Sequence, residues 1–186
     1  NMAKMPAGVT LVGEINLAKL VSIQQAKDGL KMVESHPLYA GLSKAGVTPE
    51  SLKSLMFGVG ASKSEEIPMP EFLVILENSG PVQKDVIKKE LPDDEMVKVD
   101  FIGDNVIIAG GADMVAAAKQ LAAGTGSAAT ANKELMAACE GKGQNNLVWI
   151  GAKINAEDFK AVEPQLAMSP IKPADLNSLF IGLNYG

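Results

Sequence analysis

The sequence predicts an α+β fold, in which an antiparallel or mixed sheet carries helices packed on one face. Three observations lead to this fold class. Segments that alternate apolar and polar residues, as strands do, take turns with segments of helical periodicity. Turn signals join some neighbouring strands into hairpins, which favour antiparallel pairing. One segment also occurs twice, at residues 47–59 and 171–183, with Pro, two Leu, Ser and Gly at identical positions.

The recurring segment predicts a duplicated architecture. A second repeated segment precedes each copy, since residues 11–16 resemble residues 150–155. Similar segments in the same order are typical of a duplicated supersecondary unit. We expect ferredoxin-like β-α-β-β-α-β units, with the first unit at residues 7–143 and a truncated second unit at residues 144–186 that packs on or continues the first sheet. A complete second unit needs roughly a hundred residues more, so we expect a natural gene product that is longer or was cleaved.

The first elements are a strand and two helical pieces. Residues 9–16 alternate as a strand does, and from Leu17 the apolar residues follow helical spacing for about 17 residues. Pro37 ends this helix, because proline disfavours the helical conformation in the residue before it. A second helical piece at residues 38–44 ends before Gly46, which suits a left-handed C-cap.

The next elements are a short helix, two strands and a longer helix. Residues 48–50 read Thr-Pro-Glu, which predicts a helix start with an N-cap and a first-turn proline. A strand is expected at residues 55–61, followed by a polar loop at residues 62–70. Residues 72–76 are fully apolar and predict a central strand. Residues 79–91 then carry apolar residues along one helical face.

A hairpin and two helices follow. Residues 96–102 and 106–109 are expected to pair as strands, because Gly-Asp-Asn at residues 103–105 is a good turn signal. Helices are expected at residues 114–123, which are rich in alanine, and at residues 130–139. The second unit then supplies a strand at 147–154, a helix at 156–162 and a strand at 179–185.

Composition narrows the function classes. The net charge is −5, and all 17 basic residues are lysine. Nucleic-acid binding usually needs a basic face, and arginine is the usual bidentate ligand of phosphate. We therefore expect no nucleic-acid partner and a low chance of a nucleotide enzyme. No apolar run approaches the roughly 20 residues of a membrane helix, so we expect no membrane span in this chain. No signal peptide is visible, but Asn1 before Met2 resembles a cloning scar, and the start is equally compatible with a removed leader.

Single chemistry-bearing residues give no catalytic pattern. Cys139 is the only cysteine, which excludes an intrachain disulfide and a cysteine-based zinc site. Its apolar neighbours predict a small buried side chain. His36 precedes Pro37 at a predicted helix end, where a lone histidine usually caps the helix. From these residues we expect no catalytic residue, no metal and no cofactor.

Two glycine-rich segments and two acidic clusters are candidate sites. Gly110 and Gly111 lie where a strand passes into a helix, so their backbone N–H groups are an anion-site candidate. The third glycine of the dinucleotide fingerprint is missing, and a simple strand-to-helix turn is the better interpretation. Residues 124–127 are expected to be an interhelical loop. The acidic clusters at residues 65–66 and 93–95 are expected to be solvated loop charge.

Several of these patterns together resemble a group of known proteins. They are the start at residues 6–16, the helix-strand motif at 48–59, the Gly-Asp-Asn hairpin and the strand at 106–110 before an alanine-rich helix. In these features the chain resembles duplicated α+β proteins of the bacterial cell envelope, often lipoproteins, without an assigned activity. The resemblance implies an exported, non-enzymatic protein in the periplasm or cell envelope, with a cytoplasmic location left open.

The leading functional hypothesis is a non-catalytic structural or interaction domain. An unfinished sheet leaves an edge strand that can pair with another chain, at residues 9–16 or at residues 179–185. We expect a homodimer or another protein partner at such an edge. The candidate edge residues are Leu179, Phe180, Ile181, Leu183 and Tyr185.

Two other hypotheses remain open. One is a small-ligand-binding domain with a pocket between the helices and the sheet or at the junction of the two units. The other is an enzyme that uses carboxylates such as Glu14, Asp100 or Asp104. This third hypothesis requires the carboxylates to converge in one cleft.

Overall fold

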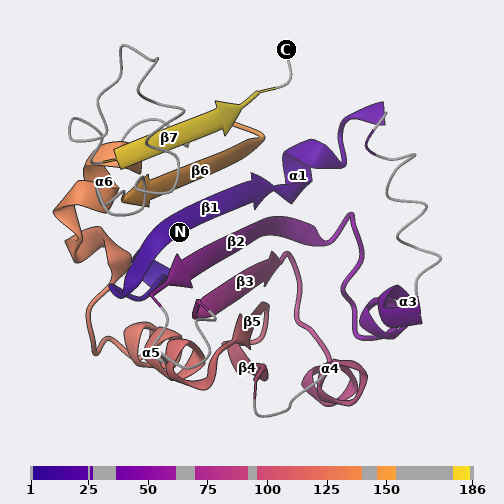
Figure 1. Cartoon of the computed structure of the whole chain (residues 1–186). Coiled ribbons are helices and arrows are strands. Elements are labelled where there is room, and N and C mark those ends of the chain that lie inside the picture. Colours follow the sequence, from indigo (N-terminus) through magenta and orange to yellow (C-terminus); the bar gives the residue numbers. More distant parts are fainter. Residues whose placement is uncertain are drawn as a thin grey trace.

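The computed structural model describes residues 2–24, 26, 37–61, 70–91, 96–139, 146–153 and 178–184 (Figure 1). These residues form an α+β fold around one seven-stranded sheet, which confirms the predicted class. Every pair of neighbouring strands is antiparallel. The strands are β1 (Val9–Asn16), β2 (Leu52–Gly60), β3 (Phe72–Asn78), β4 (Lys98–Ile102), β5 (Val106–Gly110), β6 (Val148–Lys153) and β7 (Ser178–Leu183). Their order across the sheet is β4-β5-β3-β2-β1-β6-β7.

Short helices surround the sheet. The α-helices are α1 (Leu17–Leu20), α3 (Pro37–Lys44), α4 (Lys84–Glu90), α5 (Ala112–Ala122) and α6 (Lys133–Cys139), and the 3-10 helices are η1 (Met2–Lys4) and η2 (Ala129–Ala131). The helices predicted at residues 79–91 and 130–139 are therefore present but shorter than expected. The helix predicted at residues 156–162 and most of the second repeat copy lie outside the described residues.

The helices cover both faces of the sheet, so the prediction that they pack on one face is wrong. Successive side chains of β5 show this, because neighbours along a strand point to opposite faces. Val106 and Ile108 pack in one core cluster with Met114 of α5 and residues of α6. Ile107 packs in a second cluster with α4 and the turn after α3. The physical reason is the apolar character of β3 and β5, which leaves both faces of these central strands to be buried.

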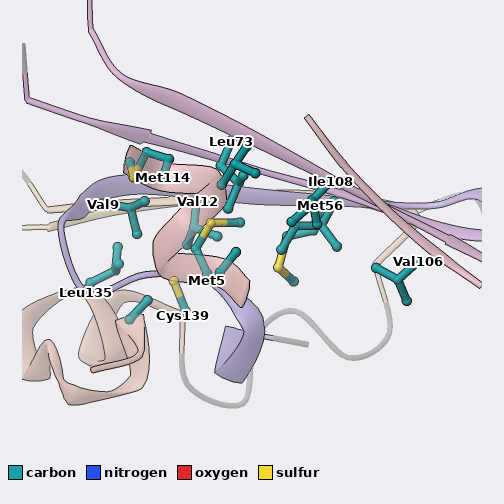
Figure 2. Packing of buried hydrophobic residues seen from close by; sticks show 14 of the residues in the cluster. Met5, Val9, Val12, Met56, Leu73, Val106, Ile108, Met114, Leu135 and Cys139 are labelled. Carbon is teal, nitrogen blue, oxygen red and sulfur yellow. The ribbon is translucent and has the colours of Figure 1, made fainter. Parts of the chain in front are cut away.

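The larger core cluster lies between β1, β2, β3, β5 and the helices η1, α5 and α6 (Figure 2). Valine, isoleucine, leucine, methionine and alanine supply most of it, as the scarcity of aromatic residues predicts. Its most enclosed side chains include Met5, Val9, Val12, Met56, Leu73, Ile108 and Leu135. The sulfur of Met5 packs onto Gly58 of β2, where any Cβ would overlap it. This cluster fixes the sheet against η1, α5 and α6.

Strand β1 lies inside the sheet, so the prediction of a free edge at residues 9–16 is wrong. It pairs with β2 on one side and with β6 on the other. The β6 pairing joins Leu11–Ile15 to residues 148–152, about 135 positions further along the chain. Local sequence does not encode such a partner. In the described residues β6 and β7 extend the sheet of β1 to β5, while the ferredoxin-like duplication and the two predicted units stay predictions.

The hairpin prediction is confirmed, and the short helix predicted after residue 48 is wrong. The β4–β5 turn contains Gly103 with φ of 61°. Residues 48–51 form a single turn in which the Ser51 hydroxyl accepts a hydrogen bond from the Thr48 N–H at 2.8 Å. Strand β2 begins directly afterwards at Leu52, because Leu52 already pairs with Asn78. That pairing leaves the segment no room for a helix.

Candidate functional site

The outer edge of β7 is the candidate site that the fold builds most clearly. Six register pairs join β7 to β6, from Ser178 opposite Lys153 to Leu183 opposite Val148. At the far end the Leu147 N–H donates to the Leu183 carbonyl at 2.8 Å. Among the described strands β6 is the single neighbour of β7, which therefore ends the sheet (Figure 1). The predicted edge at this position is present, although Tyr185 lies outside the described residues.

The two faces of β7 differ. Leu179, Ile181 and Leu183 alternate on one face and are 44%, 49% and 61% exposed. Phe180 points to the opposite face, where its ring stacks on Trp149 with centroids 6.2 Å apart and an interplanar angle of 18°. Trp149 itself is buried in the larger core cluster. The strand is thus held on one face by the core and shows three apolar side chains on the other.

An apolar surface continues from β7 across the sheet. The direct partners of Leu179, Ile181 and Leu183 on β6 are Ala152, Ile150 and Val148, which are partly buried. Opposite these on β1 stand Leu11, Gly13 and Ile15. We call the nine residues of these three rows the β7 face. Its exposed part is the row on β7, since the β6 row, Leu11 and Ile15 are partly buried and Gly13 is buried. Exposed apolar residues that lie together in this way typically mark an interaction site.

The opposite edge of the sheet, β4, is protected in ways that β7 is not. It carries Lys98 and Asp100, and the Asp100 carboxylate binds Lys119 Nζ of α5 at 2.5 Å. Burial raises the pKa of Asp100, but hydrogen bonds from Lys119 and the Phe101 backbone lower it more, so the net pKa lies below its ordinary value. Charged residues are a common protection of edge strands. Residues 178–184, by contrast, contain no charged residue and no proline.

Glycines stand opposite aromatic residues at three places in this half of the sheet. Phe57 is the direct partner of Gly13, and a Cβ on that glycine would overlap the ring. Trp149 stands opposite Gly182, and Phe180 stands opposite Gly151. At Gly13 the ring of the partner lies over the glycine and covers backbone that a glycine alone leaves bare. At Gly151 the Cβ position is occupied by the Cys139 sulfur and at Gly182 by Asn146, so these two pairs share only the register.

Gly110 and Gly111 both contact strand β3. Gly110 lies against the backbone of β3, where a Cβ would overlap the Phe72 carbonyl. The Gly111 N–H donates to the same carbonyl at 3.1 Å, so this donor is already used. Asp113 also stands in the first turn of α5. These contacts support the strand-to-helix turn over the anion-site candidate.

The structure does not bring the three candidate carboxylates together. Glu14 lies on β1 and accepts a hydrogen bond from the Trp149 indole at 3.1 Å. Asp100 lies on β4, which β5, β3 and β2 separate from β1. Asp104 lies in the β4–β5 turn, where Lys84 binds it at 2.8 Å and lowers its pKa through the hydrogen bond. Within the described ranges no group of histidine, cysteine, aspartate or glutamate residues is arranged to hold a metal ion. His36 and both acidic clusters lie outside these ranges.

A small cavity lies at one end of the sheet. Its volume is about 170 Å³, and its lining residues are Lys19, Ser22, Ile23, Leu147 and Asn184. Sites for drug-sized ligands usually measure about 300–1,000 Å³. The cavity lies beside the ends of β1, β6 and β7, where residues of the first predicted unit meet residues of the second, which is one of the two places predicted for a pocket. It is too small to hold an organic ligand of ordinary size.

Two buried groups have structural roles, one of which the sequence did not reveal. Cys139 is buried against Gly151 of β6, in agreement with its predicted packing role. Asn78, at the end of β3, is 1% exposed, and its amide donates to the carbonyls of Gly46 and Gly80 at 3.1 and 2.9 Å. In sequence Asn78 looks like an ordinary turn residue before Ser79 and Gly80. Its long-range bond to Gly46 joins the turn after α3 to the turn before α4.

In the part of the chain that the structure describes, no helix has the length and apolar character needed to span a membrane. No protein-family model, no curated protein and no solved structure matches this chain.

Proposed function

We propose that this chain is a non-catalytic interaction domain that binds a protein partner through the outer edge of β7. The observation that carries the proposal is the row of Leu179, Ile181 and Leu183, which are 44–61% exposed on a strand with one described neighbour. Burying a fully exposed side chain of this size contributes about 1.5–3 kcal/mol, and these half-exposed side chains contribute correspondingly less. An added strand also gains backbone hydrogen bonds along the edge, which is the recognition mode called β-augmentation.

Three further features support this proposal over catalysis. The candidate carboxylates lie on separate parts of the sheet, and two of them are neutralised by lysines. Cys139 is buried as a packing residue. The described polar side chains thus serve the fold, while the apolar surface at β7 has no such role. The sequence resemblance adds a location to the proposal, in the periplasm or envelope of a bacterium.

The alternative function is the binding of a small ligand. The one observation in its favour is the cavity lined by Lys19, Ser22 and Asn184. Its volume of about 170 Å³ suits a few atoms only. The edge of β7 is therefore the better-supported site.

The test is the binding of an added strand to the edge. A fluorescein-labelled peptide with the sequence of residues 178–184, solubilised by two terminal lysines, serves as the probe, and its anisotropy is followed as protein is added. We expect saturable binding to the wild type and at least about tenfold weaker binding to Ile181→Lys, because a charge replaces an apolar contact. Met96→Lys is the matched control, since Met96 is 61% exposed and precedes the other edge strand. Equal binding by all three proteins would refute the proposal, and so would the absence of binding to a wild type that light scattering shows to be a monomer.

A further inference from the structure

We propose that the partner of β7 is a second copy of this chain, whose own β7 pairs antiparallel to the first with Ile181 opposite Ile181. This inference rests on the proposed function, since it names the partner of the same edge. It follows from the order of residues along β7, which is self-complementary about Ile181. A two-fold axis perpendicular to the sheet would relate the two copies.

Charge is the first argument for a second copy. The chain carries a net charge of −5, so two copies repel each other over most of their surfaces. Residues 178–184 are uncharged, and a self-paired β7 therefore brings no like charges opposite each other. The other edge strand, β4, carries Lys98 and Asp100, and Asp100 is already bound to Lys119 of α5, so self-pairing of β4 would bury charged groups that β7 does not have. An uncharged edge also provides nothing that selects a charged peptide.

The register is the second argument. With Ile181 at the centre, Leu179 faces Leu183 of the second copy, Phe180 faces Gly182, and Ser178 faces Asn184. Facing residues always differ by an even number of positions along β7. The backbone N–H and carbonyl groups of both residues therefore point either toward the partner strand or away from it, as antiparallel pairing requires. All three exposed apolar residues then meet apolar residues on one face. Within residues 178–184, a shift of the register by two positions leaves one leucine of each copy without such a partner.

The pairing of Phe180 with Gly182 of the second copy is the third argument. The described sheet already sets an aromatic residue opposite a glycine in the pairs Phe57–Gly13, Trp149–Gly182 and Phe180–Gly151. Self-pairing of β7 repeats that arrangement twice across the two-fold axis. The Cβ position of Gly182 is 2.5 Å from Nδ2 of Asn146 and 3.0 Å from the Phe180 ring, so a larger residue there would displace both side chains. Self-pairing thus sets apolar residues opposite each other on one face and an aromatic residue opposite a glycine on the other.

Association of this kind continues the β7 face into the second copy. Antiparallel strands related by an axis perpendicular to the sheet keep the same face on the same side. Leu179, Ile181 and Leu183 of the two copies would form one apolar band, flanked by Ala152, Ile150 and Val148 on each side. The resulting sheet has β4 at both ends, where the charged edge described above stops further pairing. The assembly therefore closes as a dimer.

Cysteine cross-linking tests the register directly. Directly opposite residues of antiparallel strands have Cα atoms about 4.5–5.5 Å apart, which is within the range that a disulfide spans. We expect Ile181→Cys to form a disulfide-linked dimer under mild oxidation. Leu179→Cys and Leu183→Cys should each stay largely unlinked alone and should link to each other when the two variants are mixed. The wild type is the control for the native thiol, because Cys139 is buried.

The outcomes separate this inference from the proposed function. If Leu179→Cys or Leu183→Cys links to itself as readily as Ile181→Cys does, the proposed register is wrong. If none of the variants links but the peptide still binds at Ile181, the edge binds a different strand and the second copy is refuted, while the proposed function stands. If neither linking nor peptide binding occurs, both proposals fail. Light scattering of the unmodified chain adds the oligomeric state, and a monomer at high concentration refutes the second copy.

Discussion

The aromatic ring of Phe57 lies across Gly13, its direct partner on the neighbouring strand of the sheet. The ring occupies the space that a Cβ at residue 13 would need, and it covers backbone on the same face as Ile150, the partner of Gly13 on β6. The pair joins β2 to the half of the sheet that ends at β7. Its two residues are therefore coupled in stability, and this coupling is measurable.

Replacing Gly13 by alanine is expected to destabilise the fold by about 1–3 kcal/mol, because the added methyl group overlaps the Phe57 ring. Urea unfolding followed by the fluorescence of Trp149 measures the free energy of unfolding. In a Phe57→Leu background the same substitution should cost less, since the ring is gone. Gly8→Ala is the control and should change stability by less than about 0.5 kcal/mol, as no atom lies within 4 Å of a Cβ there. An equal cost in both backgrounds would mean that the ring does not cause the effect.

Replacing Asn78 by aspartate is expected to destabilise the fold by about 3 kcal/mol or more at neutral pH. The side chain is 1% exposed, and the new carboxylate would face the carbonyls of Gly46 and Gly80 in place of two N–H donors. Protonation removes the charge, so the variant should be less destabilised near pH 4 than near pH 7. Asn132→Asp is the matched control, because Asn132 accepts a hydrogen bond from the Leu135 N–H at a helix start, where a carboxylate is equally suitable. Similar losses in both variants would contradict the role of the donors.

Replacing Asp100 by asparagine is expected to have a small effect that depends on pH. The pKa of Asp100 in the folded state lies below its ordinary value of 3.8. Its contribution is therefore present above the unfolded-state pKa and is lost as the pH falls through the folded-state pKa. Because the pair with Lys119 is partly exposed, we expect a loss of about 0.5 kcal/mol at neutral pH and a smaller difference near pH 3. In a Lys119→Met background, Asp100→Asn should leave the free energy of unfolding nearly unchanged at either pH. If the loss of stability in Asp100→Asn grew as the pH was lowered, the stabilising role of the Asp100 carboxylate would be contradicted.

The thiol of Cys139 is expected to react with a disulfide reagent only when the core opens. It is 6% exposed and lies against Gly151 in the larger cluster. We expect the folded chain to react at least about 100-fold more slowly than the chain in concentrated urea, since local opening limits the rate. Met96→Cys supplies the comparison, because Met96 is 61% exposed and the introduced thiol should react rapidly in the native state. Rapid modification of the wild type would show that the packing around Cys139 is loose.

The elements that the sequence predicted correctly are those encoded by neighbouring residues. The β4–β5 hairpin follows from Gly103 and its polar neighbours, and the central position of β3 follows from its unbroken apolar run. The edge at β7 was predicted, but the edge at β1 was not correct, because the β1–β6 pairing joins distant segments whose register no local signal records. The distribution of helices over both faces follows from the apolar character of β3 and β5, which have a core cluster on each face.

The candidate site was predictable in part. The residues of β7 could be identified because alternation and the lack of charge are visible in the sequence. The β7 face could not, since it is assembled from rows that run across β7, β6 and β1. The role of Asn78 also depends on a carbonyl that is 32 positions away in the chain. Its short polar side chain before a glycine gave only a turn signal.

The position of β1 in the interior of the sheet has a consequence for how the protein is made. The edge of β1 that pairs with β6 cannot form its hydrogen bonds until residues 148–153 have been synthesised. The contact between Glu14 and Trp149 spans 135 positions. Long-range pairings of this kind slow folding, and a newly synthesised strand with one side open is prone to pair wrongly. At an elongation rate of about 5–20 residues per second, this exposure lasts roughly 7 to 27 seconds. Among the described strands, β1 is thus the earliest to be synthesised and one of the last to gain both of its neighbours.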